Sequence, residues 1–361
     1  MYLTESEIMS QHLALKKTRE YMNGQRQELQ AFFGRYPQHR FVFLGCGSSF
    51  MLAKSAQCMF GACADTSAYA LAGGDYLVHP DYYKEMMQDS ILVTVSRSGQ
   101  TSEIVRSAAH IKERYGIPIL SISMKDQNDI MPYTDMDLTM DWCYDQSVCQ
   151  TRTVTNLYLA LAMLLGFYRG DDQLLADLAA AVDANEEYTR RYRPVLKEIA
   201  VKNWDHAVVL ADGPLNGLGE EGALAFTEIA MVPGQCFHLL DYRHGPMVLN
   251  GEHTLTVVFV QPKEGTLQAD LIRDLQQRGG TLVTVSGFEE PDRKEELPGV
   301  DANVEIGGYT GWIASGISFI FVCQILAYEK AIALGQNPDK PKGLDAFITL
   351  NGGNEETAGT E

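Results

Sequence analysis

The chain of 361 residues is 45% hydrophobic and 21% charged, an ordinary globular composition with enough apolar residues for one large or two medium cores. Its 29 Lys and Arg residues against 47 Asp and Glu residues give a net charge of −18, and the basic residues are scattered along the chain. Such a surface repels a phosphate backbone, so the composition excludes nucleic-acid binding, and an anionic ligand needs a local pocket of hydrogen-bond donors.

Cysteine usage and hydropathy predict a cytoplasmic protein. The seven cysteines are odd in number and none has CxxC or Cys/His zinc-site spacing, which favours free thiols in a reducing compartment and no metal site. The opening "MYLTESEIMSQHL" has no apolar signal core. Polar residues, including Ser315, Gln324 and Lys330, interrupt the apolar stretch 311–335, so we expect a buried helix there and no membrane partner.

The first part of the chain alternates strands with helices. Thr4 and Glu7 have the spacing of a capping box ahead of an opening helix, and a second polar helix is predicted over 24–34. Short apolar runs that end in polar turns then precede helical patterns, which predicts a mainly parallel sheet. The predicted elements are a strand and turn over 40–50, a helix over 51–63, a strand over 67–74, a strand, turn and helix over 89–116, and a strand over 117–123.

Residues 153–200 are predicted to be helical, with an amphipathic segment after Gly170 that bridges to a second unit. From residue 205 the strand, turn and helix pattern restarts, so the chain holds two similar α/β halves. The predicted boundaries are N-terminal helices at 1–38, a first domain at 39–200, a second domain with a C-terminal coil at 201–350, and a disordered tail at 351–361.

Two polar turns of the first half follow strands and precede helices: "GCGSS" at 45–49 and "SRSGQTS" at 96–102. Helix N-termini offer unpaired N–H groups and the positive end of the helix dipole, and serine hydroxyls add further donors. Two such turns from neighbouring strands predict a phosphate site, to which Arg97 adds a charge unless its side chain points to solvent. The alternative is that Ser48, Ser98 and Thr101 are only helix caps.

Other phosphate motifs fit poorly. No G-x-x-x-x-G-K-[ST] occurs, which argues against a P-loop. "GCGSSF" carries the first two glycines of a dinucleotide fingerprint, but Phe50 replaces the third, so dinucleotide binding is only a second interpretation.

The second half offers groups for proton transfer. Glu221 and Glu228 are seven residues apart on a predicted helix and share one face. His244 follows in the tight loop "DYRHGPMVL". A carboxylate and a histidine suit general acid–base catalysis, although a surface glutamate and a hydrogen-bonded loop histidine remain the alternative.

Taken together, "CGSS", "SRSGQTSE", "SVCQTRT", "EGALAFTE" and "RHGP" make the chain resemble the SIS (sugar isomerase) family. The resemblance extends over nearly the whole chain and is greatest to the tandem-SIS enzymes, which include the isomerase half of glucosamine-6-phosphate synthase and the fructosamine-6-phosphate deglycases. It implies an α/β fold of two flavodoxin-like parallel-sheet αβα sandwiches in tandem. It further implies a homodimer or higher oligomer with an active site shared between subunits, and no cofactor.

The resemblance also assigns roles. It makes Glu228 the proton carrier between the first two sugar carbons, His244 a ring-opening residue that crosses a dimer interface, and Glu221 a supporting carboxyl. Arg97 stands where many members have glutamine. The residues matched to phosphate and sugar binding are Cys46, Gly47, Ser48, Ser49, Ser96, Arg97, Ser98, Thr101 and Val148.

One position departs from the synthase-type isomerases, which carry a lysine in the C-terminal coil. The aligned residue here is Ala346, with Lys340 and Lys342 four or more residues away. A lysine there handles a ketose carbonyl as an imine, so its loss argues against simple ketose isomerisation. Because the chain also opens directly on its first helix, we expect no glutaminase domain.

These observations predict a fructosamine-6-phosphate deglycase, whose substrate already carries an amine at carbon 1. An aldose–ketose or amino-sugar-phosphate isomerase or deaminase is the alternative within enzymes. A non-catalytic phosphosugar sensor is the alternative from another class, disfavoured because both Glu228 and His244 are present.

Overall fold

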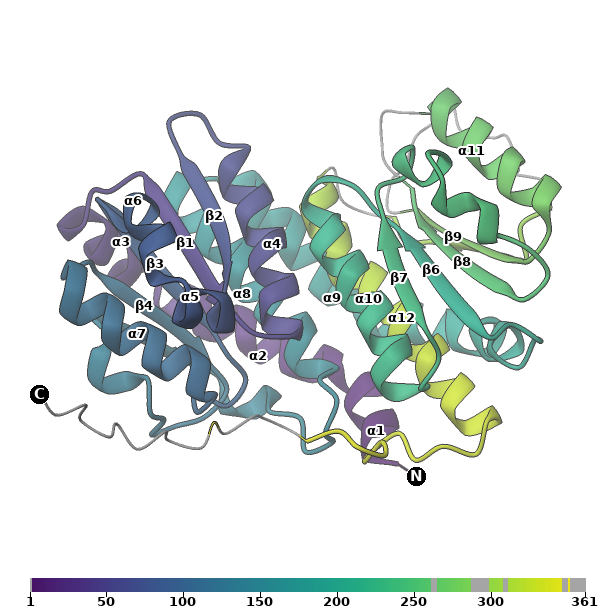
Figure 1. Ribbon diagram of the computed structural model, residues 1–361, viewed down its shortest axis with the longest axis horizontal. Coiled ribbons are helices and arrows are strands. Elements are labelled where there is room, and N and C mark those ends of the chain that lie inside the picture. The colour runs from purple at the N-terminus through teal and green to yellow at the C-terminus, as the bar shows by residue number, and fades with distance from the viewer. Residues whose placement is uncertain (1, 261–264, 287–298, 308–310, 346–349, 351–361) are drawn as a thin grey trace, which may run out of the picture.

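The computed structural model describes residues 2–260, 265–286, 299–307, 311–345 and 350. Two five-stranded sheets, both entirely parallel, form the framework of the chain (Figure 1). The first has the order β2-β1-β3-β4-β5 and the second the order β10-β9-β8-β6-β7. Renumbered within its own half, each sheet has the same 2-1-3-4-5 order, which is flavodoxin-like. The predicted fold of two similar α/β halves is therefore confirmed.

The strands are short and mostly buried on both faces, as parallel strands between helices are. The first sheet comprises β1 (Arg40–Gly45), β2 (Ser67–Ala72), β3 (Ser90–Val95), β4 (Ile119–Ser123) and β5 (Met136–Thr139). The second comprises β6 (His206–Leu210), β7 (Gly234–Phe237), β8 (Thr254–Phe259), β9 (Thr281–Ser286) and β10 (Ala302–Glu305). The edge strands β5 and β10 have four residues each, too few for a clear alternation pattern, and the sequence analysis did not predict them.

Helices cover the sheets and fill the space between them. The N-terminal helices are α1 (Leu3–Met9), α2 (Gln11–Gly24) and α3 (Arg26–Arg35). The first half continues with α4 (Ser48–Gly61), α5 (Gly73–Val78), α6 (Lys84–Met87), α7 (Ser102–Tyr115), α8 (Arg152–Arg169) and α9 (Asp172–Ala200), and the second half holds α10 (Asn216–Ile229), α11 (Gly265–Arg278) and α12 (Trp312–Ala333).

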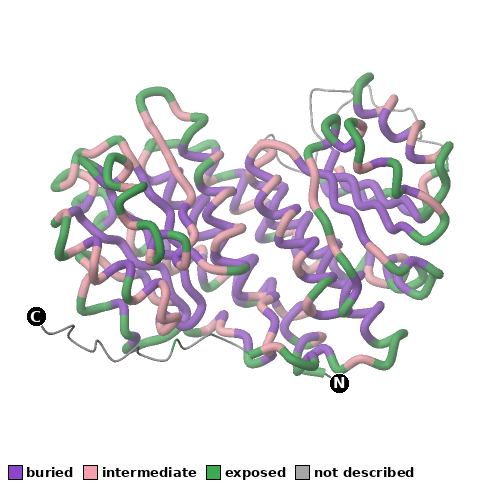
Figure 2. Tube along the Cα trace, viewed as in Figure 1, coloured by how far each residue is buried: buried purple, intermediate pink, exposed green. Residues whose placement is uncertain are grey.

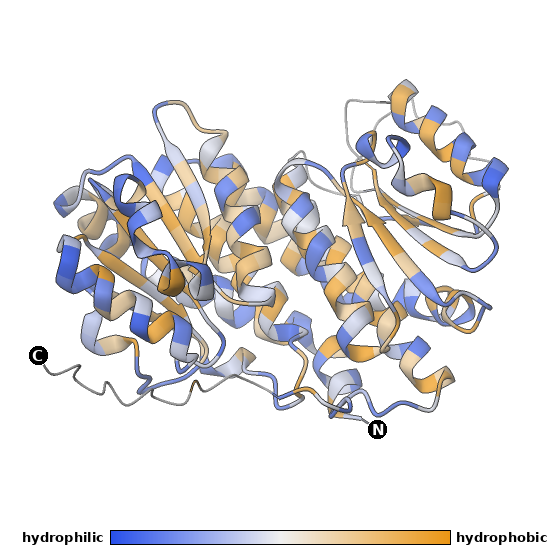
Figure 3. Cartoon of the chain, in the orientation of Figure 1, coloured by the Kyte–Doolittle hydropathy of each residue, from blue (hydrophilic) through white to orange (hydrophobic). Residues whose placement is uncertain are grey.

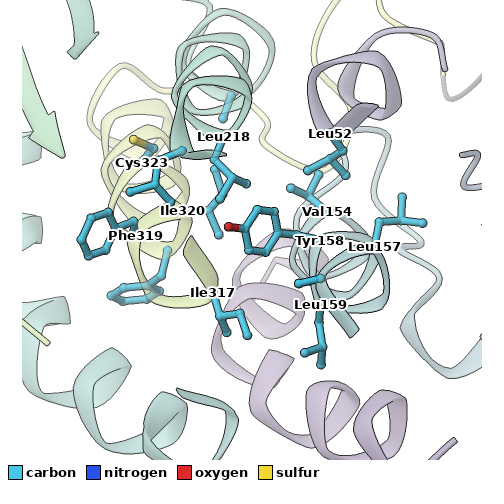
Figure 4. Close-up of a cluster of buried hydrophobic side chains, with 14 of the residues drawn as sticks. Leu52, Val154, Leu157, Tyr158, Leu159, Leu218, Ile317, Phe319, Ile320 and Cys323 are labelled. Carbon is cyan, nitrogen blue, oxygen red and sulfur yellow. The ribbon is translucent and has the colours of Figure 1, made fainter. Parts of the chain in front are cut away.

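A central helical layer joins the two halves (Figure 1). The buried chain runs without a break from one sheet through this layer to the other, and the apolar strands and central helices contrast with the hydrophilic outer faces of α7 and α11 (Figures 2 and 3). In Figure 4 the ring of Tyr158 on α8 lies in the middle of this layer, and its hydroxyl donates to the carbonyl of Ile313 at 2.8 Å. Tyr192 of α9 bonds the backbone of Glu305 in β10, which confirms that α9 bridges to the second half.

The apolar stretch near the C-terminus is the core helix α12. It is the one helix among the described residues that is long and apolar enough to cross a membrane, but 89% of its most apolar window is buried inside the protein. The prediction of a buried helix is therefore confirmed.

The predicted capping box at the N-terminus is wrong. No side chain caps α1 from its own end; instead the carboxylate of Asp339, in the coil after α12, accepts from the N–H groups of Leu3 at 2.9 Å and Thr4 at 2.8 Å. Glu7, the supposed second member, accepts from the backbone N–H groups of Gln146 and Ser147. A distant acceptor satisfies the helix end because the coil returns past α1 toward the first half (Figure 1). The disordered tail predicted at 351–361 and Ala346 lie outside the described residues.

Candidate active site

The two serine-rich turns lie side by side at the carboxyl edge of the first sheet. β1 ends at Gly45 before α4, and β3 ends at Val95 before α7. The two strands are hydrogen-bonded neighbours, and the chain leaves them toward opposite edges of the sheet. This is the switch point where open parallel sheets bind ligands.

Two glycines shape the first turn. A Cβ on Gly45 would stand 2.5 Å from the carbonyl of Ser49, so the backbone of α4 approaches the end of β1 only because no side chain is there. Gly47 has a φ of 54°, a conformation that glycine adopts without strain. The turn therefore directs the first N–H groups of α4 toward the space above the sheet.

Helix capping does not account for the serines and threonine of these turns. The N-cap residues of α4 and α7 are Gly47 and Thr101, and neither helix receives a side-chain cap. Ser96 and Ser98 hold their own turn instead, since their Oγ atoms accept from the N–H groups of Gly99 at 2.9 Å and Gln100 at 3.1 Å. These bonds use the oxygen of each hydroxyl and not its proton, so the Ser96 and Ser98 hydroxyls can still donate to a ligand.

A pocket of about 200 Å³ opens between the turns. All the residues predicted for binding line it except Glu221, and Glu228 lines it as well. The lining residues are Cys46, Gly47, Ser48, Ser49, Val95, Ser96, Arg97, Ser98, Thr101, Ile104, Val148, Gln150, Glu228, Leu344 and Asp345.

Three polar or coil residues of this lining were not predicted as site residues. Gln150 belongs to the "SVCQTRT" motif, so its neighbourhood was singled out. Leu344 and Asp345 precede position 346 of the C-terminal coil, which the resemblance singled out, but no local pattern marks these two residues themselves. Lys340 and Lys342 are exposed and neither lines the pocket.

Arg97 is buried rather than directed to solvent. Its Nη1 donates to the carbonyls of Ser147 at 3.2 Å and Val148 at 3.0 Å, and its guanidinium lies 5.6 Å from the ring centre of Tyr144. The side chain therefore joins the second turn to the segment that forms another wall of the pocket, while its charge acts on Glu228.

Glu228 enters the site from the second half, on the last turn of α10. Burial raises the pKa of its carboxyl, and the positive charge of Arg97 opposes this rise. A carboxyl whose pKa is raised toward the working pH is suited to accept and return a proton.

Glu221 lies two helical turns before Glu228 and is only 3% exposed. Burial, followed by the charge of Glu228, raises its pKa well above the ordinary value, and the nearby hydroxyl of Ser48 opposes this rise. Glu221 is therefore buried near Ser48 of the first turn without lining the pocket. This position beside the turn fits the supporting role that the resemblance implies.

His244 does not line the pocket of its own chain. It is exposed, and its backbone N–H donates to Asp241 at 2.9 Å at the end of a short 3₁₀ turn. The neighbouring Arg243 pairs with Asp274 of α11 at 2.6 Å. The structure therefore brings Glu228 to the turns and leaves His244 outside this group.

Buried carboxylates hold the segment 145–151, which forms one wall of the pocket, through hydrogen bonds. Asp145 accepts from the N–H groups of Thr151 at 2.7 Å and Thr153 at 2.9 Å, and Glu7 accepts from the hydroxyl of Ser147. Burial and the nearby Glu7 raise the pKa of Asp145 to about 6. These bonds hold Val148 and Gln150 in the pocket wall.

The thiol and metal chemistry of the site is limited. Burial raises the pKa of Cys46 to about 11, so its thiol stays protonated at neutral pH and forms part of the pocket wall. Among the described residues, the cysteines are free and no group of three or more His, Cys, Asp or Glu side chains is arranged to hold a metal ion.

Comparison with known proteins agrees with this geometry. Residues 36–165 match the SIS domain family model. The chain is 22% identical over 365 residues to a glutamine–fructose-6-phosphate aminotransferase (isomerizing) of Shewanella oneidensis, covering 95% of this chain and 58% of that protein. It is 27% identical over 321 residues to a D-galactosamine-6-phosphate deaminase of Shewanella sp., covering 84% and 78% of the two chains.

The fold is also found among solved structures. The tagatose-6-phosphate ketose/aldose isomerase of Escherichia coli matches with a TM-score of 0.80 at 18% identity, over 94% of this chain and 95% of that one. The chain spans little more than half the length of the aminotransferase relative, so the similarity concerns a part of that protein.

Proposed function

We propose that this chain, a member of the SIS domain family, is an enzyme of 6-phosphorylated sugars and, more specifically, a fructosamine-6-phosphate deglycase. The observation that carries the proposal is that Glu228 lines the same pocket as the two serine-rich turns. A phosphate at the turns would leave the sugar carbons within the same enclosed space as a carboxyl with a raised pKa.

The reaction follows from these groups. The turns bind the phosphate through hydroxyl and backbone N–H donors. The carboxylate of Glu228 takes a proton from carbon 1 of the open-chain ketosamine and returns a proton to carbon 2. The amine nitrogen gives up one proton and the carbonyl oxygen at carbon 2 gains one, so the ketosamine becomes an imine at carbon 1 with a hydroxyl at carbon 2. Water adds to that imine and the carbon–nitrogen bond breaks, giving an aldose 6-phosphate and a free amine.

The missing coil lysine supports the deglycase over a ketose isomerase. Position 346 is alanine, and the amine of a ketosamine supplies the nitrogen that an enzyme lysine otherwise provides. Lys340 and Lys342 are exposed outside the pocket, which argues against either as a replacement.

An amino-sugar-phosphate deaminase or isomerase is the second candidate, favoured by the similarity to the galactosamine-6-phosphate deaminase over 84% of this chain. It needs the same phosphate site and the same proton carrier. The deaminase differs from the deglycase in releasing ammonia, and the isomerase differs in releasing no amine. A non-catalytic sensor of phosphosugars accounts less well for a half-buried carboxyl with a raised pKa in the pocket.

We further propose a homodimer in which His244 of the partner subunit completes the site and opens the sugar ring. The exposure of His244 and its position outside its own chain's pocket support this arrangement. An imidazole has one ring nitrogen that donates a proton and one that accepts, and is therefore suited to move the ring-opening proton.

The test is incubation of the protein with a panel of 6-phosphorylated fructosamines, and in parallel with fructose 6-phosphate plus ammonia and with galactosamine 6-phosphate. A coupled dehydrogenase reads the release of glucose 6-phosphate, and an ammonia assay reads deamination. We expect glucose 6-phosphate from the fructosamines. Ammonia release from galactosamine 6-phosphate alone would favour the deaminase, and no turnover of any substrate would favour the sensor.

A further inference from the structure

The coil after α12 places a carboxylate in the pocket. Asp345 lines the pocket together with Glu228 and the serine-rich turns. Two contacts set the path of the coil that carries it: the carbonyl of Asp339 accepts from Val148 at 3.0 Å, and Leu344 packs on the central core. Asp345 is therefore held at the pocket by the fold, although its own side chain is exposed.

The carboxylate of Asp345 has no ion pair or hydrogen bond with any residue in the described part of the chain. A carboxylate accepts hydrogen bonds and donates none, so it cannot contribute to binding a phosphate dianion. Its natural partner is a cation, and Arg97, the one cationic residue among the described residues of the lining, already bonds Ser147 and Val148.

The charges of the lining show what kind of ligand satisfies Asp345. Besides Arg97, the charged lining residues are the carboxyls of Glu228 and Asp345. A ketose 6-phosphate without an amine brings only negative charge into this pocket, where like charges repel at close range. A ketosamine 6-phosphate also brings a secondary amine, which is largely protonated at neutral pH and offers N–H donors.

We propose that Asp345 is a specificity residue that binds the ammonium group of a ketosamine 6-phosphate and so selects such substrates over ketose phosphates that carry no amine. This inference rests on the proposed function, because it assigns the amine of that substrate a binding partner. It also gives the lysine-to-alanine departure a counterpart: beside the position that lacks the lysine, the coil offers an anion to an amine that the substrate carries.

The test uses a fructosamine 6-phosphate made from a simple alkylamine, whose only cation is the ketosamine nitrogen. For Asp345→Asn we expect KM to rise on the order of tenfold, as for loss of a charge-assisted hydrogen bond. We expect kcat to change little and the inhibition constant of glucose 6-phosphate, which has the phosphate and no amine, to stay unchanged. Asp345→Glu should restore most of the affinity, and Asp345→Lys should raise KM on the order of 100-fold.

Glu252→Gln is the matched control, because it removes one exposed carboxylate outside the pocket and should leave KM as it is. The inference is overturned if Asp345→Asn leaves KM unchanged, or if it weakens glucose 6-phosphate as much as the ketosamine, since Asp345 would then serve the coil or the phosphate site. If the wild-type protein turns over no ketosamine, the proposed function fails. Calorimetric dissociation constants of the fructosamine 6-phosphate and of glucose 6-phosphate, measured for the wild-type protein and for Asp345→Asn, then decide the inference. Weaker binding of the fructosamine 6-phosphate alone supports it, and an equal loss of affinity for both ligands, or no loss, overturns it.

Discussion

At the scale of single residues, two opposing effects act on the pKa of the Glu228 carboxyl. Burial on α10 raises the pKa of Glu228, and the charge of Arg97 lowers it. The guanidinium of Arg97 is itself held in place by the backbone carbonyls of Ser147 and Val148. The protonation of the proton carrier is therefore set by its distance from solvent and by one fixed cation.

The first prediction at this scale concerns Glu228→Gln. The substitution keeps the size and removes the base, so turnover should fall by about 10²–10⁴-fold while a substrate analogue still binds. A raised pKa means that Glu228 takes up its proton at a higher pH than an ordinary glutamate, near 4.3. Since only the ionised form is a base, kcat/KM of the wild-type protein should fall on the acid side with a midpoint above about 4.3. Near-full turnover by Glu228→Gln would show that another group carries the proton.

The second prediction concerns Arg97→Gln. Removing the cation removes the effect that lowers the pKa of Glu228, so that pKa should rise further. The acid limb of the kcat/KM profile should then move to higher pH. Arg97→Lys keeps the charge and should move the limb less. An unchanged limb in Arg97→Gln would mean that the acid limb reports a different group.

At the scale of elements, the site exists because helix α10 of the second half packs against helix α4 of the first. A Cβ on Gly217 would stand 2.2 Å from the carbonyl of Met51, so the two backbones are in contact at this point. The pair of Lys54 with Glu220 at 2.6 Å lies along the same interface. This packing presents Glu228, at the far end of α10, to the turns that begin α4 and α7.

The third prediction tests that packing. Gly217→Ala forces the helices apart, and we expect the free energy of unfolding to fall by about 1–3 kcal/mol, as for other overpacked sites. Gly61→Ala is the control, since a Cβ at Gly61 meets nothing within 4 Å and alanine is the better helix former. Denaturant unfolding of both variants measures the difference. Equal stability of the two variants would contradict the close approach.

At the scale of the whole molecule, the chain closes on itself through its C-terminal coil. The coil caps α1 with Asp339, contacts the wall at Val148 and delivers Asp345 to the pocket. The pocket is therefore built from the turns of the first half, α10 of the second, and the coil. His244 is the one proposed catalytic residue outside this assembly, which makes the oligomeric state decisive for function.

The fourth prediction tests whether subunits share a site. Glu228→Gln and His244→Ala should each be inactive, and a mixture of the two after subunit exchange should regain about a quarter of the wild-type turnover. In a mixed dimer one of two sites has both residues intact, and about half of the dimers are mixed. Sedimentation should show a dimer at micromolar concentration. No recovery from a mixture shown to contain mixed dimers would place His244 and Glu228 in the same subunit's site, and full activity of His244→Ala alone would remove His244 from catalysis.

What the sequence by itself determined is local. The apolar runs that end in Gly and Ser predicted β1, β3 and the turns after them, because strand burial, turn conformation and helix starts depend on neighbouring residues. The spacing of Glu221 and Glu228 likewise placed both on one helix face. The tertiary structure alone decided which groups meet. It buried Arg97, replaced the expected cap of α1 with Asp339, and brought Asp345 to the pocket, because these contacts join segments far apart in the chain whose distances no local pattern encodes.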